Sequence, residues 1–130
     1  MADLTTAQLT ELADNYQSMA KQLMQYKLSH LAEFNSVQVQ DMTTRVSLLL
    51  HNSNLLTALS TIQAVQDLKP HLASIKQSTA DLQKTLDKIK KVQEAIDIAT
   101  IVVNLGSALV TQNFNKIAEH AAELAAAVKG

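Results

Sequence analysis

Apolar side chains recur every three or four residues along most of the chain, which is the spacing that gives a helix one apolar face. Near the N-terminus the repeat consists of Leu9, Leu12, Tyr16, Met19, Leu23, Tyr26 and His30. Thr5 and Gln8 have the spacing of a capping box, in which each side chain satisfies a backbone amide at a helix start. Asn35 and Ser36 interrupt the repeat. The pattern therefore predicts a first helix from about residue 5 to about residue 35.

A second helical repeat extends from residue 37 to about residue 68. Its apolar positions are Met42, Val46, Leu49, Leu56, Leu59, Ile62 and Val65. Leu48, Leu50 and Leu55 widen the apolar stripe, so this helix is expected to be buried on more than one side. The polar run 51–54 (His-Asn-Ser-Asn) leaves open a kink or break, because Asn and Ser compete for backbone hydrogen bonds.

The longest repeat follows Lys69 and Pro70, which indicate a turn and the start of a third helix. It continues through Leu72, Ile75, Thr79, Leu82, Leu86, Ile89, Gln93, Ile96, Thr100 and Val103. This spacing predicts the longest coiled-coil-like element of the chain. Gly106 offers an early stop as a left-handed cap, but the residues after it continue the helical pattern, so we favour a stop at residues 111–113.

A short final helix is predicted from about residue 114 to residue 128, with its stripe at Ile117, Ala121, Leu124, Ala125 and Val128. Four helices with short connections predict a single all-α domain over residues 1–130. Its expected architecture is an elongated antiparallel up-down bundle of about four helices with coiled-coil-like packing. The last helix is too short to cover the others, so part of their apolar stripe is expected to stay open.

Composition narrows the class of protein. The chain has 130 residues, of which 47% are hydrophobic and 18% charged, with a net charge of −1, and these values favour one folded core over disorder. Two Gly, one Pro and no Cys argue against a many-stranded sheet and exclude disulfides and thiolate metal sites. No classical secretion signal opens the chain, so a cytoplasmic location is the default expectation, and non-classical secretion stays open.

The sequence contains none of the common catalytic or metal-binding motifs. The four His are scattered, Gly stands only at positions 106 and 130, and most carboxylates fall on the expected solvated faces. We therefore expect no enzymatic activity, no catalytic residues, no metal or cofactor, and infer no small-molecule substrate. Six Lys lie between residues 69 and 94, but no aromatic residue accompanies them, so nucleic acid is not expected as a partner.

Two uncharged stretches, residues 46–66 and 98–115, approach the length of about 20 residues that spans a bilayer core. Both contain Asn, Ser, Thr or Gln, which are costly in lipid unless they face one another or water. We favour the interpretation that both stretches are the doubly covered centre of the bundle. The alternative is a membrane-active segment at residues 95–112, with candidate residues Ile98, Ile101, Val102, Val103, Leu105, Leu109 and Val110.

The leading functional hypothesis is a non-enzymatic helical bundle that mediates assembly with itself or with another helical protein. Its expected assembly seam is Leu82, Leu86, Ile89 and Ile96. The alternative is a membrane-active bundle with a lipid membrane as partner. In architecture, long helices with a late hydrophobic run resemble cytolysin A-like pore-forming toxins, and Gln-, Ala- and Leu-rich amphipathic helices resemble the phasins. These resemblances imply a pore-forming component or an amphipathic coat on lipid or granules.

Overall fold

The chain is all-α, as the repeats predict. The computed structural model describes residues 6–59, 69–111 and 113–128, and within these ranges it contains five α-helices, one short 3₁₀ helix and no strand. The elements are α1 (Thr6–Ser29), η1 (Leu31–Glu33), α2 (Ser36–Leu59), α3 (Lys69–Lys88), α4 (Val92–Thr111) and α5 (Phe114–Val128). The bundle thus has one more helix than the four expected.

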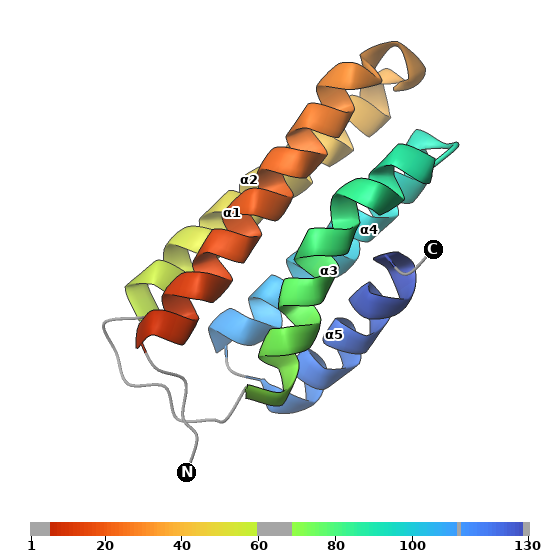
Figure 1. Cartoon of the computed structure of the whole chain (residues 1–130). Helices are drawn as coiled ribbons and strands as arrows, with labels where there is room; N and C mark the ends of the chain where they lie inside the picture. The colour runs from red at the N-terminus through yellow and green to blue at the C-terminus, as the bar shows by residue number, and fades with distance from the viewer. Residues whose placement is uncertain (1–5, 60–68, 112, 129–130) are drawn as a thin grey trace.

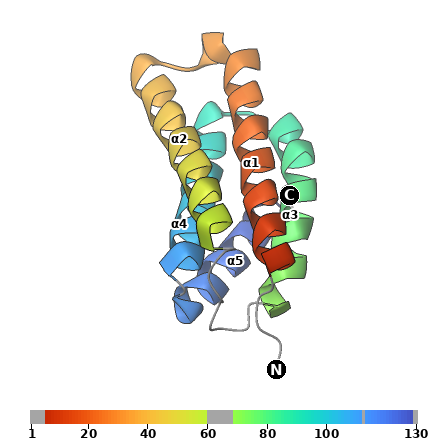
Figure 2. The same ribbon diagram turned by 90° about the vertical axis from the view of Figure 1, so that its left-hand side faces the viewer.

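The helices form two layers (Figures 1 and 2). Helices α1 and α2 lie side by side in one layer, and α3 and α4 lie in the other. Across the layers α1 packs against α3, and α2 packs against α4. Helix α5 contacts both α3 and α4, on the side that faces away from α1 and α2. It closes the second layer from outside.

The prediction of one long third helix is wrong, because the chain folds back at residues 89–91. The Ile89 amide donates to the Leu86 carbonyl at 3.3 Å, and the Glu94 amide donates to the Lys91 carbonyl at 3.0 Å. Helices α1 and α2 have 24 residues each, or about 36 Å. A continuous helix over residues 69–111 would be about 65 Å long, so nearly half of its apolar stripe would project beyond them.

Two charged residues at this turn are consistent with one helix ending and another beginning. Lys88 lies in the last turn of α3 and Glu94 in the first turn of α4, where each has the sign that the local helix dipole favours. The apolar spacing carries no such signal, because both halves keep the same three-and-four repeat across the turn. The repeat therefore predicts the two helical segments but not the reversal between them.

The first helix is shorter than predicted and ends at Ser29. Its end is organised by an aromatic cluster, in which the His30 ring stacks on Tyr26 at 4.2 Å and Phe34 meets Tyr26 edge to face at 6.2 Å. A reciprocal capping box then starts α2. The Gln38 amide donates to Asn35 Oδ1 at 2.8 Å, and the Asn35 amide donates to Gln38 Oε1 at 3.1 Å. Thr5, expected to cap α1, lies outside the described residues.

Helix α2 is continuous through residues 51–54, so the break left open by the sequence does not occur. Asn52 and Ser53 are buried, and the Ser53 hydroxyl donates to the Ala13 carbonyl of α1 at 2.7 Å. These polar side chains bond across helices instead of to their own turn. The helical repeat predicted for residues 60–68 lies outside the described residues.

The later part of the chain agrees with the predicted bounds. Helix α4 runs to Thr111, as favoured, and α5 covers residues 114–128. The Lys116 amide donates to Asn113 Oδ1 at 3.3 Å, so Asn113 caps the start of α5. Ile117, Ala121, Leu124 and Val128 of the predicted stripe are buried.

Candidate assembly surfaces

The predicted assembly seam lies inside the folded chain. Leu82 is 0% exposed, Leu86 1% and Ile96 2%, and Ile89 is partly buried against the same core. The repeat on α3 and α4 is therefore satisfied by α1, α2 and α5. A role for these residues in assembly stays a prediction, and it would require the bundle to open first.

The predicted membrane-active segment lies on α4. Ile98, Val102, Leu105 and Leu109 are buried, whereas Ile101, Val103 and Val110 are partly buried. Among the described helices, α4 alone is long and apolar enough to cross a membrane, with a mean hydropathy of 1.4. Half of that window is buried in the bundle. A core helix of a soluble protein has the same character, so a membrane-active role of this segment stays a prediction.

Polar side chains from the first layer hold α4 in register. The Tyr16 hydroxyl, fully buried, donates to the Val102 carbonyl at 3.1 Å. Arg45 Nε donates to Thr100 Oγ1 at 2.8 Å. Burial raises the pKa of Tyr16 well above its ordinary value, because the phenolate would lose its hydration. Each of these contacts joins α4 to α1 or α2, so together they fix how α4 docks.

Gly106 permits the closest approach between α4 and the first layer. A Cβ atom at this position would lie 2.5 Å from Asn52 Nδ2 and 2.8 Å from Tyr16 Cε2. Both distances are shorter than van der Waals contact, so a larger residue has to displace one of these two side chains. Gly106 therefore lies within α4 as a packing residue rather than as a helix cap.

Large exposed apolar side chains concentrate on the first layer and its connection. Among the described residues they are Met24, Leu28, Leu31, Val37, Leu48 and Leu50. The expectation that Leu48 and Leu50 are buried is wrong, since they are 41% and 39% exposed. Leu48 and Leu50 are two positions apart on α2 and therefore point to different sides of this helix.

Four of these residues form a surface that we call the α1–α2 patch: Met24, Leu28, Leu31 and Leu50. Met24 and Leu50 line a shared groove of about 230 Å³ between α1 and α2, together with Lys21. Leu28 follows Met24 at helical spacing on α1 and is 62% exposed, and Leu31, in η1 just after the end of α1, is 49% exposed. Sequence reasoning missed this surface, although Leu28 and Leu31 fall off the apolar repeat of the first helix.

The patch faces away from the second layer. Gln22 on α1 donates to the Thr79 carbonyl of α3 at 3.3 Å, and Asn52 on α2 donates to the Val103 carbonyl of α4 at 3.5 Å. Met24 and Leu50 are each two residues from one of these side chains. Residues two apart on a helix point about 200° apart, so the patch is directed outward.

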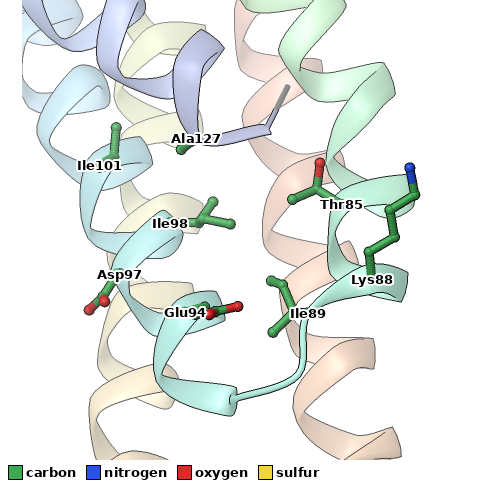
Figure 3. Close-up of a pocket in the computed structure, with 8 residues that line it drawn as sticks. All are labelled: Thr85, Lys88, Ile89, Glu94, Asp97, Ile98, Ile101 and Ala127. Carbon is green, nitrogen blue, oxygen red and sulfur yellow. The ribbon is translucent and has the colours of Figure 1, made fainter. Parts of the chain in front are cut away.

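A second surface is a cleft that α5 leaves uncovered, which we call the α3–α4 cleft. Its volume is about 420 Å³, and it is lined by Thr85, Lys88, Ile89, Glu94, Asp97, Ile98, Ile101 and Ala127 (Figure 3). The Thr85 hydroxyl donates to the Val128 carbonyl at 2.6 Å, which holds the end of α5 on α3. Because α5 ends there, the part of the groove nearest the α3–α4 turn stays open.

Among the described residues, no three His, Asp or Glu side chains lie close enough together to hold a metal ion. His120 Nδ1 lies 2.6 Å from Glu123 Oε1 on α5, which is a local pair at a helix surface. Tyr26 has a raised pKa because of burial and the nearby charges of Glu33 and Glu94. Neither feature forms a reactive constellation.

Comparison with known proteins gives no match: no protein family, no curated protein and no solved structure resembles the chain closely enough to be assigned. Functional inference therefore rests on the geometry of the chain itself. Among the described residues, the α1–α2 patch and the α3–α4 cleft each combine apolar side chains with a groove.

Proposed function

We propose that the chain is a non-enzymatic helical-bundle protein that assembles with itself or with another helical protein through the α1–α2 patch. The observation that carries this proposal is the distribution of exposed apolar side chains. Among the described residues the large ones all lie between residues 24 and 50. Single exposed apolar residues are ordinary, but neighbouring ones that share a groove are typical of an interaction surface.

Burial of the apolar patch residues favours assembly. Burying one Leu or Met side chain stabilises a contact by about 1.5–3 kcal/mol, so four such residues supply a large part of a protein–protein contact. Gln17 and Lys21 also line the groove, so it has polar groups beside its apolar ones, as specific interfaces do. The buried Leu82, Leu86 and Ile96 offer no such area in the folded chain. The proposal thus moves the assembly surface from α3 and α4 to α1 and α2.

Light scattering after size exclusion tests the proposal on the full chain over a concentration series. The Leu28→Asp variant places a charge at the most exposed position of the patch, and we expect it to shift the assembly to the monomer. Ala80→Asp is the matched control, because it adds the same charge at an exposed position of α3. If the two variants form the same oligomers and capture a helical partner equally well, the proposal is contradicted.

A second candidate function is membrane activity, and α4 is the observation that favours it. The helix has 20 residues, and its only charged residues are Glu94 and Asp97 in its first two turns. Entry into lipid would require α4 to leave its contacts with Tyr16 and Arg45. This function predicts co-flotation with anionic liposomes that Val103→Asp weakens and Ala80→Asp does not. A protein that stays in the soluble fraction at every pH tested rules it out.

A further inference from the structure

The two candidate surfaces lie on opposite faces of the molecule. The α1–α2 patch is on the outer side of the first layer, and the α3–α4 cleft opens beside the end of α5 in the second layer (Figures 1 and 3). In the patch, Leu28 is the most exposed side chain, and Met24 and Leu50 line a groove. In the cleft, Ile98 and Ile101 come from α4, Ile89 from α3 and Ala127 from α5. Both surfaces are therefore apolar, so their chemical character matches.

Their charges are complementary as well. Lys21 lies one turn before Met24 and lines the patch groove. Glu94 and Asp97 line the α4 side of the cleft, and both are exposed. Glu94 extends toward Ile89 across the mouth of the cleft, whereas Lys88 runs along α3, away from the α4 wall (Figure 3). A cation that arrives with an apolar group therefore meets the Glu94 carboxylate at the mouth of the cleft, whereas Asp97 points away from the cleft and accepts from Gln93 Nε2 at 3.0 Å.

We propose that the partner of the α1–α2 patch is a second copy of this chain, whose α3–α4 cleft receives the patch. This inference rests on the proposed function and adds the partner and the receiving surface. Met24 and Leu28 of one copy pack against Ile98 and Ile101 of the next. Lys21 of the first copy lies beside Glu94 of the second. The contact joins two different surfaces and is thus heterologous.

A heterologous contact between opposite faces does not close on itself in a pair. Each added copy leaves one patch free at one end and one cleft free at the other, so growth continues into rings or open chains. The wild-type protein is expected to form species that lengthen with concentration, not a single closed dimer. A contact of patch with patch would instead stop at two copies.

Complementary variants test this arrangement directly. Leu28→Asp removes the patch and leaves the cleft, whereas Ala127→Phe fills the cleft and leaves the patch. We expect each variant alone to be monomeric in light scattering after size exclusion. An equimolar mixture is expected to give one species of twice the 14.2 kDa chain mass, because one patch and one cleft remain to join. Far-ultraviolet circular dichroism and a thermal melt establish that both variants are folded.

The outcomes separate this inference from the proposed function. If Ala127→Phe assembles like the wild type while Leu28→Asp is monomeric, the patch pairs with itself, so the inference fails and the proposed function stands. If both variants assemble like the wild type, both fail. A wild-type chain that is monomeric throughout a series reaching millimolar concentration overturns the inference, and partner capture then decides the proposed function.

A charge exchange gives an independent test that uses exposed positions only. Lys21→Glu and Glu94→Lys are each expected to weaken assembly at least several-fold, because each places like charges together. The double variant restores the opposite-charge contact and is expected to recover most of the wild-type assembly. Additive weakening in the double variant would show that these two residues do not meet, which contradicts the proposed docking.

Discussion

The α1–α2 hairpin and the α3–α4 hairpin are built from similar apolar repeats but have different surroundings. Helices α1 and α2 pack directly on each other, and their outer side carries Met24, Leu28 and Leu50 in the open. Helices α3 and α4 are joined by a short turn, and α5 packs against both of them. The outer side of the second hairpin is covered by α5, whereas no described helix covers the outer side of the first hairpin.

This difference shows which part of helix packing an apolar repeat predicts and which part it does not. A heptad stripe predicts that a helix will be covered, but the cover can be another part of the chain or another molecule. Leu86 belongs to its apolar repeat and is 1% exposed, whereas Leu28 lies off the repeat of the first helix and is 62% exposed. The effect of a substitution on the stability of the fold should therefore differ sharply between the two hairpins.

The largest expected effect contrasts Leu86→Lys with Leu28→Lys. A Lys at the buried position puts a charge into the core, which costs a large share of a typical stability of about 5–15 kcal/mol, so we expect loss of the cooperative unfolding transition. The same substitution at Leu28 is expected to change stability by less than about 0.5 kcal/mol. Thermal and urea unfolding followed by circular dichroism measure both. Similar losses in the two variants would contradict the different surroundings of the hairpins.

Next in size is Gly106→Val, which tests the close contact between α4 and the first layer. The added side chain has to displace Asn52 or Tyr16, so we expect a loss of about 1–3 kcal/mol in the free energy of unfolding. Ser107→Val is the matched control, because it puts the same β-branched side chain at an exposed neighbouring position of α4. Equal urea midpoints for the two variants would show that Gly106 has no packing role.

The smallest effect concerns the Tyr16 hydroxyl and depends on pH. Burial raises the pKa of Tyr16, so in the folded chain the group stays neutral above the ordinary phenol value of about 10, while the unfolded chain ionises. The stabilisation is complete below pH 10 and declines as the pH rises above it. Tyr16→Phe is expected to cost about 1 kcal/mol at neutral pH and to flatten this alkaline decline.

Urea unfolding at several alkaline pH values measures that slope. Tyr26→Phe is the comparison variant, because the pKa of Tyr26 is also raised but less strongly. An alkaline decline that is unchanged in Tyr16→Phe and abolished in Tyr26→Phe would place the sensitive phenol at the aromatic cluster near His30 instead of at α4.

Much of the local structure followed from the sequence alone. The spacing of apolar residues determined that the chain is all-α, and it located α5 and the end of α4 at Thr111. Helical periodicity is a local property, because residues three and four apart share a face whatever lies opposite. The capping box at Asn35 and Gln38 is equally local, although the apolar repeat marked Asn35 only as an interruption.

Only the tertiary structure decided which faces meet. The reversal at residues 89–91 follows from the length of α1 and α2, a distant constraint that the repeat on α3 and α4 does not contain. The inward position of Asn52 depends on Val103, and the need for Gly106 depends on Tyr16, both remote in sequence. In each case, which apolar face is buried depends on residues far away in sequence. These contacts form only when the whole chain folds.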